Sequence, residues 1–241
     1  MANQILFIFE GKTAESQIVS NLQKFFLNKN TTIKCVLGAE IYQIYKEIAA
    51  DDDLDIFNLI KERNDETQKI LEDYKRNDFA EIYMFFDYDG HSTLANDTKL
   101  AELLEFFNEE TEKGKLYISY PMVESLKHIC SFDTFKELTV ECKENINYKR
   151  LVNNEALNEL NNFTIYTLDI WKQLINIHLK KMNFVTVGSL KLPNNLISQY
   201  IVFEYQLAKY IKPNSTVAVL SAFPMFLYDY YGNVGIKKRI E

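Results

Sequence analysis

Four short apolar runs constrain the fold of this chain more than any other feature of the sequence. Residues 4–9 (Gln-Ile-Leu-Phe-Ile-Phe) and 81–86 (Glu-Ile-Tyr-Met-Phe-Phe) are continuous rather than alternating in hydrophobicity, and residues 32–37 and 115–119 predict two more strands. A strand that is apolar on both sides is typical of a parallel sheet buried between helices. Helical patterns separate the runs, so the sequence predicts an α/β fold with a parallel sheet of about four strands flanked by helices.

The helical segments follow the same order along the chain. In the N-terminal half we expect helices over residues 13–28, with Thr13 as N-cap, over 40–76 with an acidic break at 51–53, and over 97–113. After Pro121 the pattern changes, and a mostly helical C-terminal half is expected. Its predicted helices are residues 122–130, 133–143, 153–182 and 195–211, with a short strand at 184–188.

Composition excludes several classes of protein. With 241 residues, 47% of them hydrophobic and 25% charged, the chain has enough material for one large domain or a core with a smaller appendage. The three cysteines show no Cys-x-x-Cys spacing, so neither a zinc ribbon nor a secreted disulfide framework is predicted. No segment has the ~18 apolar residues of a membrane span, and no signal peptide is recognisable. We therefore expect a cytoplasmic protein without a membrane partner.

Charge is distributed unevenly. Residues 1–120 carry 23 acidic and 13 basic side chains, a net charge of −10, whereas residues 121–241 carry 11 and 14, a net charge of +3. Lys and Arg contacts to phosphates supply most non-specific affinity for nucleic acids, so such an acidic chain is a poor binder of polyanions by itself. If it acts on nucleic acid, a partner is expected to help hold the substrate.

Three acidic residues stand where predicted parallel strands end. Glu10 follows the first strand, and Asp87 and Asp89 follow the third. Ligands of open α/β sheets bind at this edge. Asp87 and Asp89, two apart in an extended chain, would point to the same side, and a divalent cation such as Mg²⁺ or Mn²⁺ would relieve their repulsion. The alternative is that these acids only cap helices or face solvent.

The same residues carry a resemblance to a known fold. Glu10-Gly11 after one strand and Asp87-Tyr88-Asp89-Gly90 after another resemble the two motifs of the topoisomerase-primase (TOPRIM) fold. The stretch 9–15 (Phe-Glu-Gly-Lys-Thr-Ala-Glu) is similar to the opening of RloB-like proteins and TOPRIM nucleases of the overcoming-lysogenization-defect type. The resemblance implies a TOPRIM-like catalytic domain at residues 1–130, followed by a helical region at 131–241 that aligns with no family.

The resemblance also implies roles for individual residues. Glu10, Asp87 and Asp89 match the acids that bind Mg²⁺ or Mn²⁺ and carry catalysis. Glu15 matches a further acid, which some relatives place where this chain has Ala14, and Glu124 in the segment 120–125 matches a fourth ligand loosely. From the residues themselves, Lys12 could contact the scissile phosphate or be a solvated loop lysine, and His91 could move protons or bind metal. His128 and His178 are predicted to be structural.

The implied function is a metal-dependent phosphodiesterase, an endonuclease on DNA or RNA that acts as an effector in phage defence with an ABC-type or SMC-like ATPase partner. Assembly as a homo-oligomer is left open. One alternative is a haloacid-dehalogenase-type phosphatase, because residues 86–90 (Phe-Asp-Tyr-Asp-Gly) also look like the nucleophile motif of that family. The other is a non-catalytic regulatory subunit that keeps the TOPRIM fold.

Overall fold

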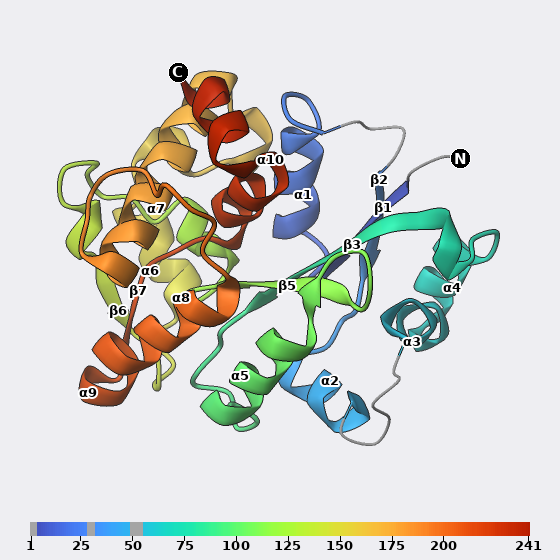
Figure 1. The fold of residues 1–241 in the computed structure, drawn as a ribbon. Helices are drawn as coiled ribbons and strands as arrows, with labels where there is room; N and C mark the ends of the chain where they lie inside the picture. The colour runs from blue at the N-terminus through green and yellow to red at the C-terminus, as the bar shows by residue number, and fades with distance from the viewer. Residues whose placement is uncertain (1–3, 28–31, 49–54) are drawn as a thin grey trace. The chain divides into compact units, whose positions relative to one another are not determined.

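The computed structural model describes residues 4–27, 32–48 and 55–241. The acidic break expected at residues 51–53 lies outside these residues. Within them the fold is α/β, with a mostly parallel sheet flanked by helices, as the sequence predicts (Figure 1).

The sheet has five strands in the order β2-β1-β3-β5-β4. The predicted strands are β1 (Gln4–Phe9), β2 (Thr32–Val36), β3 (Phe79–Asp87) and β5 (Gly114–Ser119), and β1 pairs in parallel with both β2 and β3. The fifth strand, β4 (Asn108–Glu109), runs antiparallel to β5. The helix expected over 97–113 is therefore too long: α5 (Asp97–Phe106) ends at the Phe-Phe pair, and the chain turns back onto β5.

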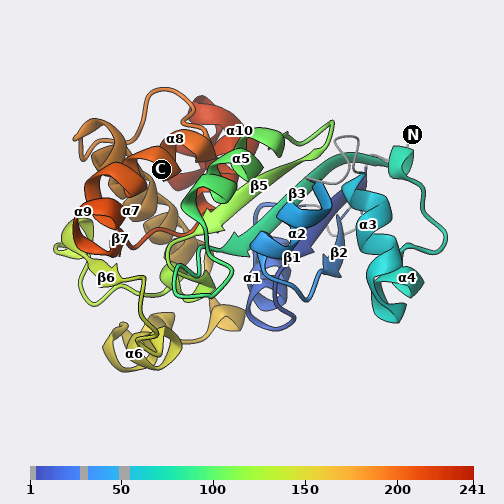
Figure 2. The same cartoon turned by 90° about the horizontal axis from the view of Figure 1, so that it is seen from below.

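Helices cover both faces of this sheet. Figures 1 and 2 show α1 (Ala14–Leu22) on one face, with α2 (Ile41–Ile48) and α5 on the other. Two further helices, α3 (Ile56–Arg63) and α4 (Asp65–Leu71), contact each other. Thr13 is the N-cap of α1 as predicted, although its side chain makes no capping hydrogen bond, and α1 stops at Leu22 rather than near residue 28.

The chain divides into two compact units. The first comprises Met1–Phe86 and Asn96–Leu116, and the second comprises Asp87–Ala95 and Tyr117–Glu241. Strands β3 and β5 pass from one unit into the other, so their last residues belong to the second unit. The division at residue 130 that the resemblance implies stays a prediction.

The second unit is mostly helical. Its longest helices are α7 (Leu168–Val187) and α10 (Ala222–Ile240), which contact each other, and α7 also contacts α8 (Gln199–Gln206). The shorter helices are α6 (Tyr148–Glu155) and α9 (Lys212–Asn214), which follows a π-helical turn at Leu207–Ile211. Among the helices of the described residues, none combines the length and hydrophobicity needed to cross a bilayer.

Four sequence predictions in this half are wrong. The helix expected at 153–182 is interrupted, because α6 ends at Glu155 and α7 begins only at Leu168. Part of the helix expected at 133–143 is strand β6 (Thr139–Glu141), which pairs antiparallel with β7 (Thr216–Ala218). The strand expected at 184–188 is the last turn of α7, which ends at Gly188 in the left-handed conformation with φ 77°. The helix expected at 122–130 is only a 3₁₀ turn, Val123–Leu126.

A buried glutamine side chain completes strand β7. The amide of Gln206 on α8 donates to the Ala218 carbonyl at 2.7 Å and accepts from the Ala218 N–H at 2.9 Å, and Gln206 is fully buried. One side chain thus satisfies both main-chain groups of Ala218, a residue of β7.

We expect Gln206→Glu to destabilise the protein by about 2–4 kcal/mol, because a carboxylate cannot donate to the Ala218 carbonyl and its charge would be buried. Urea denaturation measures the change. The control is Gln173→Glu on the exposed face of α7, which should change the free energy of unfolding by less than about 0.5 kcal/mol. Equal effects of the two substitutions would contradict the pairing.

His178 lies in the core of the second unit as a neutral ring, consistent with the structural role predicted for it. Its Nδ1 accepts from the Ser221 N–H at 3.3 Å, and its Nε2 lies 3.4 Å from the Leu126 carbonyl, so Nε2 carries the proton. Burial, followed by the charge of Lys181, lowers the pKa of His178 from 6.5 to about 3. Between these two values the unfolded chain binds a proton that the folded chain does not.

This shift predicts that His178 stabilises the fold fully above about pH 6.5 and loses that contribution as the pH falls toward 3, by up to about 1.4 kcal/mol per pH unit. The Gln in His178→Gln can make the same two hydrogen bonds but does not titrate. Between about pH 4 and 6, the free energy of unfolding of the wild type should therefore fall with decreasing pH more steeply than that of His178→Gln. The expected difference in slope is up to about 1.4 kcal/mol per pH unit. Identical slopes would contradict a neutral His178.

Candidate metal centre

The main chain of Glu10 is fixed by both strands that flank β1. The Glu10 N–H donates to the Phe85 carbonyl of β3 at 3.2 Å, and the Glu10 carbonyl accepts from the Gly38 N–H at 3.2 Å, just past β2. Phe9 and Phe85 are paired directly in the β1–β3 ladder. Because hydrogen bonds on both sides fix the main chain of Glu10, its side chain extends from a defined position at the carboxyl end of β1.

Asp87 is the last residue of β3, two positions beyond Phe85, and is buried. The chain then leaves the strand direction, because Asp89 is in the left-handed region with φ 40°. The expectation of an extended Asp87–Asp89 segment is therefore wrong. Main-chain hydrogen bonds hold the turn: the Tyr88 N–H donates to the Ser119 carbonyl at 3.0 Å, and the Asp89 N–H donates to the Pro121 carbonyl at 3.3 Å. Asp tolerates this conformation better than most residues.

The three predicted acids come together at this sheet edge. One carboxylate oxygen from each of Glu10, Asp87 and Asp89 lies within 4.8 Å of the others. Three hard oxygen donors at this spacing fit Mg²⁺ or Mn²⁺, which prefer carboxylate ligands and keep several waters. Like charges this close are unfavourable by themselves, and a divalent cation removes that cost.

Glu124 is the predicted ligand whose environment fits a cation best after these three. It lies in the 3₁₀ turn after β5, is 3% exposed, and its Oε1 is 3.7 Å from the Lys149 ammonium. Its Oε2 is buried and has no hydrogen-bond partner among the described residues. A buried carboxylate oxygen without a donor is rare, because its desolvation is uncompensated. A cation or an ordered water would satisfy it.

The remaining predicted residues have other contacts. Glu15 is buried on α1 and accepts from the Gly11 N–H at 3.1 Å, which orders the turn after Glu10. Lys12 is exposed and forms an ion pair with Glu66 at the start of α4. His91 Nδ1 lies 4.0 Å from an oxygen of Asp89, so this imidazole does adjoin the acidic turn. The roles of Glu15 as ligand and Lys12 as catalytic residue stay predictions.

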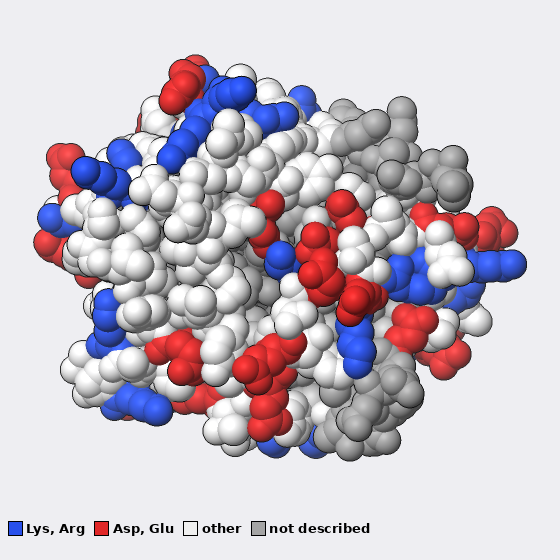
Figure 3. All heavy atoms as spheres, in the orientation of Figure 1, with Lys and Arg blue, Asp and Glu red and all other residues white. Residues whose placement is uncertain are grey.

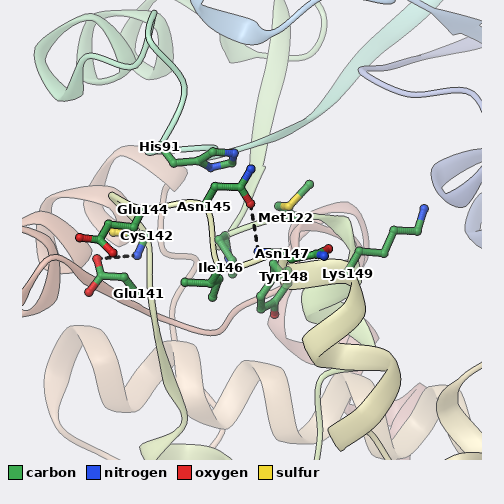
Figure 4. Close-up of a pocket in the computed structure, with 11 residues that line it drawn as sticks. His91, Met122, Glu141, Cys142, Glu144, Asn145, Ile146, Asn147, Tyr148 and Lys149 are labelled. Carbon is green, nitrogen blue, oxygen red and sulfur yellow. Dashed lines mark hydrogen bonds between the residues drawn. The ribbon is translucent and has the colours of Figure 1, made fainter.

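A pocket of about 180 Å³ in the second unit lies beside this turn (Figure 4). Its lining comes from three segments: the loop after β3 with His91, the segment after β5 with Pro121 and Met122, and residues 141–149. In the last segment Asn145 accepts from the Asn147 N–H at 2.9 Å, and Asn147 has φ 51°. Left-handed residues other than glycine concentrate at functional sites.

The sequence patterns did not predict the residues that this segment contributes. Tyr148, Asn147 and Lys149 lie in a stretch that no predicted element covered, and Tyr148 begins α6. The available signal was the Asn-x-Asn spacing of residues 145–147, since Asn favours turns before helix starts.

Tyr88 and Gly90 form the support beneath the acidic turn. Tyr88 is fully buried, and its hydroxyl accepts from the Lys143 ammonium at 2.8 Å. A Cβ on Gly90 would lie 2.5 Å from the Tyr88 ring and 2.8 Å from the Cys142 carbonyl. Only glycine fits, because the second contact is with main-chain rather than flexible side-chain atoms.

Gly90→Ala is therefore expected to cost about 1–3 kcal/mol of stability, as overpacking usually does. The control is Gly235→Ala, where the nearest atom to the new Cβ is 3.3 Å away on a side chain and a helix former replaces glycine. Thermal denaturation of the two variants provides the comparison. A Gly90→Ala protein as stable as the wild type would show that the turn can move.

No family model, curated protein or solved structure matches this chain.

Proposed function

We propose that this protein is a Mg²⁺- or Mn²⁺-dependent phosphodiesterase that cleaves nucleic acid. The observation that supports the proposal most is the group of three carboxylates, Glu10, Asp87 and Asp89, whose oxygens lie within 4.8 Å at the ends of adjacent strands. Bound Mg²⁺ or Mn²⁺ would supply a Lewis acid that neutralises a phosphodiester and makes water a better nucleophile. DNA and RNA share this chemistry, and the carboxylates do not distinguish them.

The residues of the chain contribute positioning and proton transfer. Asp87 and Asp89 would hold the cation through a turn that main-chain hydrogen bonds fix, and Glu10 would complete the group from the neighbouring strand. His91 lies near Asp89 on the same turn, and its imidazole can transfer a proton to or from a leaving oxygen. A fixed constellation of this kind lowers the cost of bringing the reacting groups together.

The charge of the chain supports a partner in the same assembly. On the described part of the face drawn in Figure 3, basic side chains lie in separate small groups among acidic ones rather than in one track. Since affinity for nucleic acid grows with the number of basic groups that reach phosphates, we extend the proposal to a partner that supplies them. The motif resemblance supports an ATPase in this role and an effector function in phage defence.

We expect the purified protein to cleave single- or double-stranded oligonucleotides when Mg²⁺ or Mn²⁺ is present, and to lose at least about 100-fold in rate in Glu10→Gln, Asp87→Asn and Asp89→Asn. The same substitutions remove like-charge repulsion, so the metal-free variants should melt no lower than the wild type. Mg²⁺ should raise the melting temperature of the wild type alone, because ligands stabilise only the state that binds them.

Asp133→Asn is the matched control, because Asp133 is an exposed carboxylate of the second unit that lies outside the group of three carboxylates. Full cleavage in EDTA, or full activity of Asp87→Asn, would refute the mechanism. Hydrolysis of phosphomonoesters with inert oligonucleotides would instead favour the phosphatase alternative.

A further inference from the structure

A second group of metal-ligand side chains lies in the second unit and has a different chemistry. His128 Nε2 is 3.0 Å from Glu155 Oε2, and Cys130 Sγ is 3.9 Å from the same oxygen. One ligand atom from each of these three residues lies within 4.8 Å of the others. The group offers an imidazole nitrogen, a thiol sulfur and a carboxylate oxygen instead of three hard oxygens.

Hydrogen bonds on both sides of the group join the two segments that carry these residues. Glu155 is the last residue of α6, and just beyond it the Leu157 N–H donates to the carbonyl of Ile129, between His128 and Cys130. That hydrogen bond is 3.0 Å long. One turn earlier, the Lys127 ammonium donates to the side chain of Asn153 on α6 at 2.8 Å. The backbone therefore holds the three side chains in reach of one another.

The His128 ring is oriented by a third group. Its Nδ1 is 3.0 Å from the Tyr148 hydroxyl, and the two rings meet edge to face at 5.3 Å. His128 is fully buried, whereas Cys130 and Glu155 are exposed. Histidines that bind metals through one ring nitrogen usually have the other hydrogen-bonded, which fixes the ring and the tautomer. His128 has this arrangement, with Nε2 directed at Glu155 and Cys130.

The distances fit a tetrahedral zinc ion. Zn²⁺ bonds of ~2.0–2.1 Å to nitrogen and oxygen and ~2.3 Å to sulfur place nitrogen and oxygen ligands about 3.3 Å apart, and sulfur and oxygen ligands about 3.5 Å apart. The observed separations from Glu155 Oε2 are 3.0 Å to the nitrogen and 3.9 Å to the sulfur, each within about 0.4 Å of these values, and the nitrogen and sulfur lie within 4.8 Å of each other. We propose that His128, Cys130 and Glu155 form a zinc site with a solvent-facing fourth position.

Zinc is the preferred occupant because of the ligand set. Thiolate and imidazole select borderline metals such as Zn²⁺, whereas Mg²⁺ prefers carboxylates and water. Three protein ligands with one position open to solvent are typical of zinc sites that bind water or an exogenous ligand. A simple ion pair between His128 and Glu155 would need no thiol, so Cys130 is the residue that separates the two interpretations.

The test is a titration of chelator-treated full-length protein with Zn²⁺ in competition with a chromophoric chelator. The wild type should bind one equivalent per chain, and Cys130→Ser and Glu155→Gln should each weaken binding on the order of 10- to 100-fold. Cys142→Ser is the matched control, since the Cys142 thiol donates to the Ser215 carbonyl and belongs to neither candidate group. It should bind zinc like the wild type.

Two further measurements keep this site distinct from the carboxylate centre. Asp87→Asn should retain the zinc equivalent, and excess Mg²⁺ should not displace it. Co²⁺ in place of zinc should give a thiolate-to-cobalt charge-transfer band in the wild type and in Cys142→Ser, and none in Cys130→Ser. A wild type that binds no zinc at micromolar concentration, or a Cys130→Ser protein that binds it equally well, would overturn the proposal.

Discussion

The hydrogen-bonded ladder between β1 and β3 is the constraint on which the candidate metal centre depends. Phe9 pairs with Phe85, and the next main-chain N–H, that of Glu10, donates to Phe85. The ladder runs without a shift from the pair Ile5–Glu81 to the pair Phe9–Phe85. The register therefore places Glu10 and Asp87 at one edge, although their negative charges repel each other.

The sequence predicted the sheet well because its signal is local. A continuous apolar run is sufficient to identify β1, β3 and β5, and the break after each run identifies its end. The prediction failed where long-range contacts decide the structure. Strand β4 has only two residues, exposed and without an apolar pattern, and exists because it pairs with β5. Likewise, no local feature of Gln206 indicates that it completes β7, twelve residues later in the chain.

The candidate site was predictable to a similar extent. Glu10, Asp87 and Asp89 were found because strand ends are visible in the sequence and parallel strands align their ends. His128 was expected in a helix of residues 122–130, but the helical turn is only Val123–Leu126, and the ring lies beyond it. Its link to Glu155 depends on the packing of α6 against the segment 127–130, across 27 residues of chain. Patterns of helical or strand periodicity carry no information about such a contact.

Tyr148 connects the chemistry of the pocket with that of the second metal group. Burial, followed by the negative charges of Glu124 and Asp87, raises the pKa of this phenol well above 10, so its hydroxyl keeps its proton at neutral pH. Without a metal, His128 donates from Nε2 to Glu155 and accepts a hydrogen bond from the Tyr148 hydroxyl at Nδ1. If Nε2 held a zinc ion, Nδ1 would carry the proton and donate to the phenol oxygen. The Tyr148 O–H would then no longer donate to His128. Occupancy of the proposed zinc site would in this way set the direction of the hydrogen bond between His128 and Tyr148, a residue that lines the pocket.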